Sequence, residues 1–164
     1  MRSMVFTLCY LSVSYVISPA ICGAQQATPA PASPVVESAE QELFTKFTKL
    51  LTGAKLRGQF TVDGKSLDKL QEEAYDIQKV EKLPDGDLWA LTTRIKYGQH
   101  DLTVPIAIEV KWAGSTPVLT MDNMTIPGLG TFSARVVLHK DKYAGTWQHD
   151  DVGGHLFGKI ELAP

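Results

Sequence analysis

Residues 88–112 have the sequence LWALTTRIKYGQHDLTVPIAIEVKW, and this stretch decides the fold class. In residues 89–97, Trp, Leu, Thr, Ile and Tyr occupy alternate positions, and residues 102–112 place an apolar side chain at every second position. Because successive side chains of a β-strand point to opposite faces, this period predicts two strands, each with one face toward a core. The intervening Gly98-Gln-His-Asp101 predicts a turn between antiparallel neighbours. Pro105 lacks a backbone donor and is therefore expected at an edge or a bulge.

The same alternation recurs on both sides of this stretch. Further strands are predicted at residues 56–62, around Tyr75 and Ile77, and at residues 117–121, 132–138, 143–149 and 155–162. A bulge near Gln78-Lys79 would bring Val80 onto the face shared by Tyr75 and Ile77. Turn signals such as Asp63-Gly64 and LPDGD at residues 83–87 separate the strands.

Short turns between successive strands predict antiparallel neighbours, because a parallel pair needs a crossover connection of a dozen or more residues. The predicted fold is therefore mainly β: an antiparallel up-and-down meander of seven or eight strands that forms a small barrel or half-barrel. A β-sandwich is the alternative, since the same pattern of short strands suits two packed sheets.

One amphipathic helix is predicted at residues 38–52, before the first strand. Ser38 is a suitable N-cap, and Gln41 three residues later completes a capping-box pattern. Leucine and phenylalanine recur at residues 43, 44, 47, 50 and 51 as one apolar stripe, and Gly53 provides a stop. The stripe is expected to pack against a sheet or across the mouth of a barrel.

The N-terminal residues have the pattern of an export signal. Arg2 precedes an apolar run from Met4 to Ile17, which is too short for an ordinary membrane-spanning helix, and small residues follow up to Ala24. We therefore expect a cleaved signal peptide at residues 1–24, a disordered Pro- and Ala-rich linker at 25–37, and a single β-rich domain at 38–164. The exported domain is expected in the periplasm or outside the cell, without an integral membrane span.

The charge balance and the positions of the cysteines limit which binding partners and which disulfide bonds are expected. The chain carries 16 Lys and Arg against 18 Asp and Glu, a formal net charge of −2, with no long run of either sign. This balance gives no cluster of positive charge that would indicate binding to nucleic acid or anionic lipid. Cys9 and Cys22 both fall in the predicted signal, so the mature domain is expected to have no disulfide.

The last hairpin, YAGTWQHDDVGGHLFGKIEL at residues 143–162, contains the candidate metal ligands. If residues 150–154 form a five-residue loop, His149 and His155 face each other at about 5 Å. Asp151 or Asp150 could then add a carboxylate for a zinc, copper or nickel ion. A polar turn whose histidines bond to water explains the same residues, so no metal or other cofactor is assigned.

Large aromatic residues allow two interpretations of the interior. The set comprises Trp89, Tyr97, Trp112, Phe132, Tyr143, Trp147 and Phe157. A small barrel can enclose one small ligand among such rings. The simpler interpretation is that the rings fill the interior and leave no cavity.

No catalytic residue is predicted. The sequence lacks a Gly-x-Ser-x-Gly elbow, a His-Glu-x-x-His pair and a phosphate-binding glycine loop. Its glycine clusters at 128–130 and 153–154 precede predicted strands, where turns explain them.

The closing pattern YAGTWQH-x5-HLFGKI, together with LPDGD and TIPGLGTF, resembles a group of small exported bacterial proteins of planctomycete type. The resemblance covers residues 56–161 and implies no functional residue, since the group has no assigned activity. The Gly-Thr-Trp at residues 145–147 is also similar to the Gly-x-Trp of lipocalin-like barrels. That signature opens their first strand, whereas here it lies near the end, so the similarity is one of shape only.

The sequence therefore favours an exported, non-enzymatic domain that binds a small apolar molecule or a protein of the cell envelope. The second hypothesis is a structural or interaction module with a filled core. The third is a metal-binding or enzymatic site on the C-terminal hairpin.

Overall fold

The structure, a computed structural model, describes residues 34–97 and 99–162. Within these residues one helix precedes eight strands: α1 (Pro34–Leu51), β1 (Lys55–Phe60), β2 (Gln71–Lys82), β3 (Leu88–Tyr97), β4 (His100–Ala113), β5 (Thr116–Ile126), β6 (Gly130–His139), β7 (Lys142–His149) and β8 (Val152–Glu161). The predicted signal peptide and residues 25–33 of the predicted linker lie outside the described residues.

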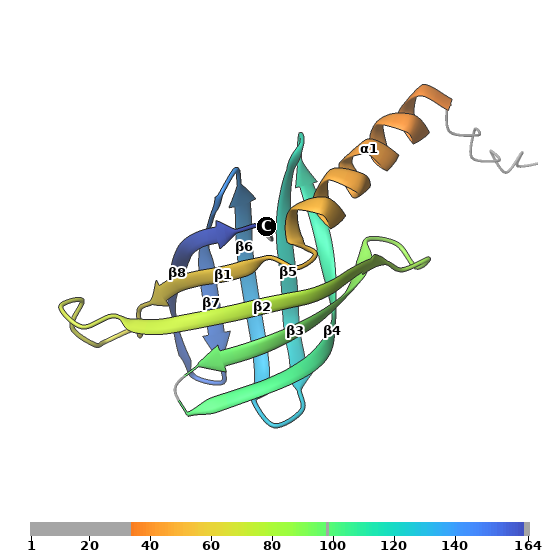
Figure 1. Cartoon of the computed structure of the whole chain (residues 1–164). Coiled ribbons are helices and arrows are strands. Elements are labelled where there is room, and N and C mark those ends of the chain that lie inside the picture. Colours follow the sequence, from red (N-terminus) through yellow and green to blue (C-terminus); the bar gives the residue numbers. More distant parts are fainter. Residues whose placement is uncertain (1–33, 98, 163–164) are drawn as a thin grey trace, which may run out of the picture. The chain divides into compact units, whose positions relative to one another are not determined.

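The eight strands form a closed antiparallel barrel in the order of the chain (Figure 1). Each strand pairs with the next, and β8 returns to pair with β1 from Lys55↔Glu161 to Phe60↔Leu156. Closure gives the first and last strands partners for backbone groups that would otherwise remain unpaired. The predicted up-and-down barrel is confirmed, and the half-barrel and the β-sandwich do not form.

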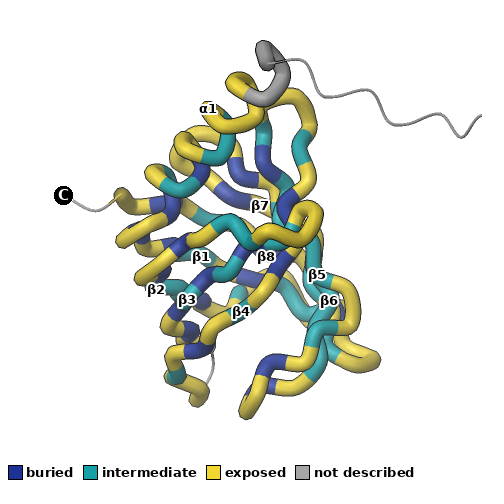
Figure 2. Tube along the Cα trace, turned by 90° about the vertical axis from the view of Figure 1, so that its right-hand side faces the viewer, coloured by how far each residue is buried: buried dark blue, intermediate teal, exposed yellow. Residues whose placement is uncertain are grey.

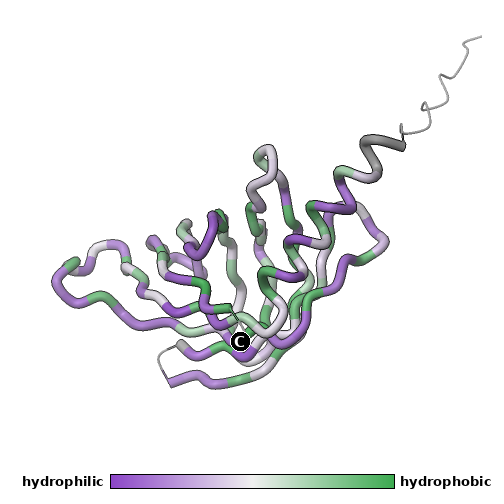
Figure 3. The backbone as a smooth tube through the Cα atoms, turned by 45° about the horizontal axis from the view of Figure 1, so that its top comes forward, coloured by the Kyte–Doolittle hydropathy of each residue, from purple (hydrophilic) through white to green (hydrophobic). Residues whose placement is uncertain are grey.

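Inner and outer positions alternate along the strands. Buried and exposed residues alternate in Figure 2, and hydrophobic and hydrophilic residues alternate in Figure 3. On β3 the buried residues are Trp89, Leu91, Thr93 and Ile95, which confirms the inner face predicted from residues 88–97.

A bulge keeps β2 in phase with the interior. The pairing of β2 with β3 shifts between Ile77 and Lys79. Ile77 and Val80 are both buried despite their odd spacing. The predicted bulge near residues 78–79 is confirmed.

Strands β4 and β5 pair with each other over only part of their length. Residues 100–109 of β4 pair with β3, but only residues 109–113 pair with β5. Pro105 therefore lies where β4 has no partner on its β5 side, as its missing donor predicts. A separate apolar cluster bridges this region: Ile95, Val104, Ile126 and Leu129.

The helix begins one turn earlier than predicted. It starts at Pro34, so residues 34–37 belong to α1 and not to the linker, and Ser38 lies inside the helix. Proline is favourable in the first turn because its φ is already helical and its missing donor is not needed there. The predicted N-cap is wrong, and the predicted end at residue 52 is correct to within one residue.

The apolar stripe of α1 covers one end of the barrel. Phe47 and Leu51 are buried. The ring centroid of Phe47 lies 4.7 Å from that of Trp89 and 5.9 Å from that of Trp112, both in edge-to-face geometry. The predicted packing of the helix is confirmed. Over the described residues, no helix combines the length and the apolar character needed to cross a membrane.

The last hairpin turns more tightly than predicted. Strands β7 and β8 are joined by Asp150 and Asp151 alone, and Asp150 adopts a positive φ of 51°. Gly153 and Gly154 belong to β8 because that strand runs close to residues 61–63: a Cβ at Gly154 would collide with the Thr61 carbonyl. The predicted five-residue loop is therefore wrong.

Candidate ligand-binding cavity

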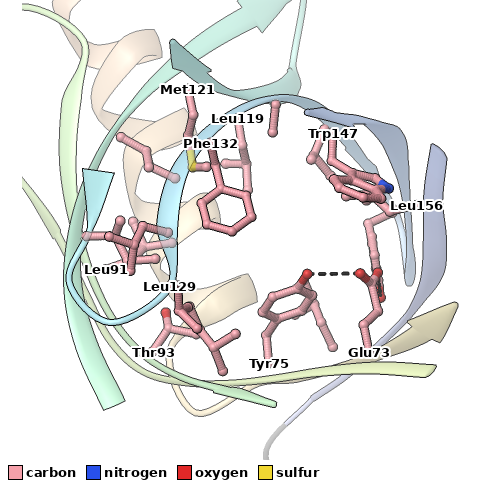
Figure 4. A pocket seen from close by; sticks show the side chains of 18 of the residues that line it. Glu73, Tyr75, Leu91, Thr93, Leu119, Met121, Leu129, Phe132, Trp147 and Leu156 are labelled. Carbon is pink, nitrogen blue, oxygen red and sulfur yellow. Dashed lines mark hydrogen bonds between the residues drawn. The ribbon is translucent and has the colours of Figure 1, made fainter. Parts of the chain in front are cut away.

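A cavity of about 180 Å³ lies inside the barrel and is partly open to solvent. All eight strands contribute to its wall through their inner positions. Most of the wall is apolar, with Leu91, Leu119, Met121, Phe132, Trp147 and Leu156 around the space that Figure 4 shows. The interior is therefore not filled by its rings.

The cavity lies between two tightly packed regions of the interior. The contact of Phe44 and Phe47 with Trp89 and Trp112 fills the end next to α1. The apolar cluster around Leu129 fills the region where β4 and β5 separate. Between these two packed regions the inner positions combine rings such as Phe132 and Trp147 with smaller side chains such as Ala134 and Val136, and space remains among them.

Glu73 is the one charged side chain in the cavity wall as the structure describes it. It lies on β2 and is 5% exposed. The Tyr75 hydroxyl donates to its Oε2 at 2.9 Å, and the Tyr143 hydroxyl donates to its Oε1 at 2.8 Å. Figure 4 shows Tyr75 and Glu73 pointing toward one another at the edge of the open space. The two hydroxyls hold the carboxyl group in place from β2 and β7.

Two glycines at the closing seam make room for this cluster. Gly58 and Gly158 are opposite each other where β1 pairs with β8. A Cβ at Gly58 would collide with the Tyr143 hydroxyl, and a Cβ at Gly158 would collide with the Tyr143 ring. The glycine pair therefore allows Tyr143 to reach Glu73 across the seam.

The surroundings favour the neutral forms of these groups. Burial raises the pKa of the Glu73 carboxyl above its ordinary value, although the hydrogen bonds from Tyr143 and Tyr75 oppose the rise. Burial also raises the pKa of the Tyr143 hydroxyl far above its ordinary value, and the Glu73 charge and hydrogen bond add to this. Among the described residues, no lysine, arginine or histidine lines the cavity to compensate the Glu73 charge.

The structure does not bring the candidate metal ligands together. His149 is opposite Val152, and His155 is opposite Thr146. The two histidines lie on opposite faces of the wall: His149 stacks on the inner residue Phe132 at a centroid distance of 4.3 Å, whereas His155 is exposed. The predicted pairing of His149 with His155 is therefore wrong, because the turn is shorter than the prediction required.

The acidic residues of the turn do not complete a metal site either. Asp150 lies 3.5 Å from the Nε2 of His149, and Asp151 is exposed in the turn. Over residues 34–97 and 99–162, no group of three His, Cys, Asp or Glu side chains is placed to hold a metal ion.

The large rings divide among three locations. Phe132, Tyr143 and Trp147 line the cavity, Trp89 and Trp112 contact the helix, and Phe157 is 43% exposed on the outer face. Trp147 and Phe157 lie on opposite faces of the wall, since residues 147 and 157 have opposite phases in β7 and β8. The side chain of Tyr97 is not among those that the structure describes.

Sequence reasoning missed the polar centre of the cavity. Glu73 has the same strand phase as Tyr75 and Ile77, both of which were expected inside. That phase was the signal that could have revealed it. It was missed because the predicted strand was placed only around Tyr75 and Ile77 and was not extended back to residue 73.

Known proteins give no guide to the function of this chain, which is therefore inferred from the geometry of the cavity. No family model, no curated protein and no solved structure matches the chain.

Proposed function

We propose that this chain is an exported, non-enzymatic binding domain whose barrel cavity holds a small apolar molecule. The observation that carries the proposal is the cavity of about 180 Å³, with an apolar wall and a single buried carboxyl group. Ligand sites are typically concave and mostly apolar, with a few polar groups that fix orientation. The signal-like pattern of residues 1–24 supports export.

The volume limits the part of the ligand that can be enclosed. An apolar cavity of about 150 Å³ is large enough for benzene. A cavity slightly larger than this suits a single substituted ring or a short branched chain. Because the cavity is partly open, a longer ligand would extend out of it.

The cavity also distinguishes this proposal from a structural module with a filled core. Empty apolar space costs stability, since the atoms lining it lose packing contacts. A protein that uses its barrel only as a rigid support gains nothing from this cost. A ligand that fills the space would offset it.

The proposal is tested by filling the cavity with a side chain. Ala134 faces the interior opposite Trp147, and Ala144 is exposed on the next strand. We expect Ala134→Leu to weaken the binding of a panel of single-ring hydrocarbons by about tenfold or more, because the new side chain occupies their space. Ala144→Leu adds the same group outside the cavity and is expected to leave binding unchanged.

Dissociation constants from NMR titration provide the measurement, with thermal unfolding of both variants as a check that they fold. The proposal fails if the unmutated protein binds none of the panel. It also fails if Ala134→Leu and Ala144→Leu bind the panel equally well.

A further inference from the structure

We infer that the ligand is a small apolar amine, with its ammonium group bound by the Glu73 carboxylate and its hydrocarbon part held by the apolar wall. This inference rests on the proposed function and adds the chemical class of the ligand. It follows from the position of one carboxyl group, from the absence of a compensating cation in the described wall, and from the rings around it.

The carboxyl group retains acceptor capacity. A carboxylate has two oxygens with about four lone-pair sites. The Tyr75 and Tyr143 hydroxyls occupy one site on each oxygen of Glu73. The remaining sites are available to a donor on a molecule inside the cavity, and an ammonium group has several donors to offer.

No cation in the described cavity wall balances the charge of the Glu73 carboxylate. The titratable groups that face it are Tyr75 from β2 and Tyr143 from β7, and both are neutral donors. Its register partners are Gly58 on β1 and Tyr97 on β3.

Arg57, Lys96 and Lys159 carry the positive charges of this part of the wall, and none of them lines the cavity. Arg57 alternates with the inward Leu56 on β1 and is bonded to Asp76. Lys96 and Lys159 line a second groove over β1, β2 and β8, and Glu73 lies in the wall of that groove as well as in the wall of the cavity. These side chains do not line the cavity, so a cation bound inside it would have to come with the ligand.

A ligand cation would lower the energy of the buried charge. A buried carboxylate without an ionic partner is costly, and a hydrogen-bonded cation is its most effective partner. The rings of Tyr75, Phe132 and Trp147 line the same space and add faces that attract cations. A carboxylate or phosphate ligand would instead place two like charges in one apolar cavity.

Three probes of equal heavy-atom count test the inference: benzylamine, benzyl alcohol and ethylbenzene. They differ only in carrying an ammonium, a hydroxyl or a methyl group. At neutral pH we expect benzylamine to bind at least about tenfold more tightly than ethylbenzene, because hydrogen bonds to charged groups stabilise more than neutral ones. NMR titration of the purified protein gives the three dissociation constants.

A matched pair of variants locates the effect. Glu73→Gln keeps the shape of the side chain and removes its charge, and Glu72→Gln makes the same change at the exposed neighbour. We expect Glu73→Gln to abolish the preference for benzylamine over ethylbenzene. Glu72→Gln is expected to preserve it.

A pH series on the unmutated protein gives the same test without a substitution. Protonation of Glu73 removes the ion pair, so the affinity for benzylamine should fall as the pH is lowered through the pKa of that carboxyl. The affinity for ethylbenzene should stay constant over the same range.

The outcomes separate this inference from the proposed function. Equal affinities for benzylamine and ethylbenzene would overturn the amine assignment and leave a cavity for neutral molecules. Benzyl alcohol binding as tightly as benzylamine would show that Glu73 selects a neutral donor, which also overturns it. Binding of none of the three would contradict the proposed function itself.

Discussion

At the scale of single residues, Glu73 carries a cost that an apolar residue at the same position would avoid. Its carboxyl is buried in an apolar wall, and two tyrosine hydroxyls compensate only part of the lost hydration. Glycines 58 and 158 add to this arrangement, since they leave space that Tyr143 uses to reach the carboxyl. Polar groups placed in this way inside a cavity are candidates for ligand recognition.

The buried carboxyl should give the protein a distinct pH dependence of stability. Because burial raises the folded-state pKa of Glu73 above its unfolded value, its contribution to stability is present below the unfolded pKa and is lost as the pH rises through the folded pKa. We therefore expect the free energy of unfolding of the unmutated protein to fall, relative to that of Glu73→Gln, as the pH rises from about 4 toward neutrality. Urea denaturation of both proteins over this range measures the difference.

The comparison with Glu73→Gln cancels the contributions of other carboxyl groups, which change the free energy of unfolding in the opposite direction as the pH rises. Arg94 lowers the pKa of Asp101, and Lys142 lowers the pKa of Asp141, so these carboxylates stabilise the fold as the pH rises. Both pairs are present in the two proteins and cancel. Parallel stability curves, or a relative gain by the unmutated protein at higher pH, would contradict the account of Glu73.

At the scale of elements, helix α1 closes one end of the barrel. Phe47 is 2% exposed and lies against both Trp89 and Trp112. We expect Phe47→Ala to lower the free energy of unfolding by about 3–5 kcal/mol, because it removes a buried ring and leaves a void. Leu67→Ala, at a side chain that is 70% exposed, is the control and should change stability by less than about 0.5 kcal/mol.

Urea denaturation at one pH measures both variants. A loss at Phe47→Ala no larger than that at Leu67→Ala would show that the helix does not seal the barrel. The helix would then be a peripheral element that contributes little to the packing of this barrel end.

The elements could be predicted where local pattern decides them. Residues 88–112 form two strands with the expected inner faces because polar and apolar residues alternate regularly along them. The turn between them is shorter than the predicted residues 98–101, since Tyr97 already pairs with His100. The bulge at residues 77–79 was predictable for the same reason, since Val80 has no other way to reach the interior.

Prediction failed where contacts between distant residues decide the structure. Gly153 and Gly154 resemble turn residues, but they are strand residues because β8 lies close to Thr61. The start of α1 was also misplaced, since Pro34 suits either a linker or the first turn of a helix. The candidate metal site failed as a consequence of the first of these errors.

At the scale of the whole barrel, closure was predictable and the empty interior was not. The number and spacing of strands indicate a closed meander, but cavity volume depends on how the inner side chains meet across it. Here Trp89 and Trp112 turn toward the helix, and Phe157 faces outward, so fewer rings occupy the centre than the sequence suggested. Glu73 was missed because the strand predicted around Tyr75 and Ile77 was not extended back to it.

The central claim, that the barrel interior accommodates a small apolar molecule, is tested most directly by methyl NMR during titration with ethylbenzene. The account predicts saturable shifts at methyl groups of the cavity wall, such as those of Leu119 and Leu156, and none at the exposed Leu67. Unchanged wall signals up to the solubility limit of ethylbenzene, or shifts confined to exposed methyl groups, would contradict it.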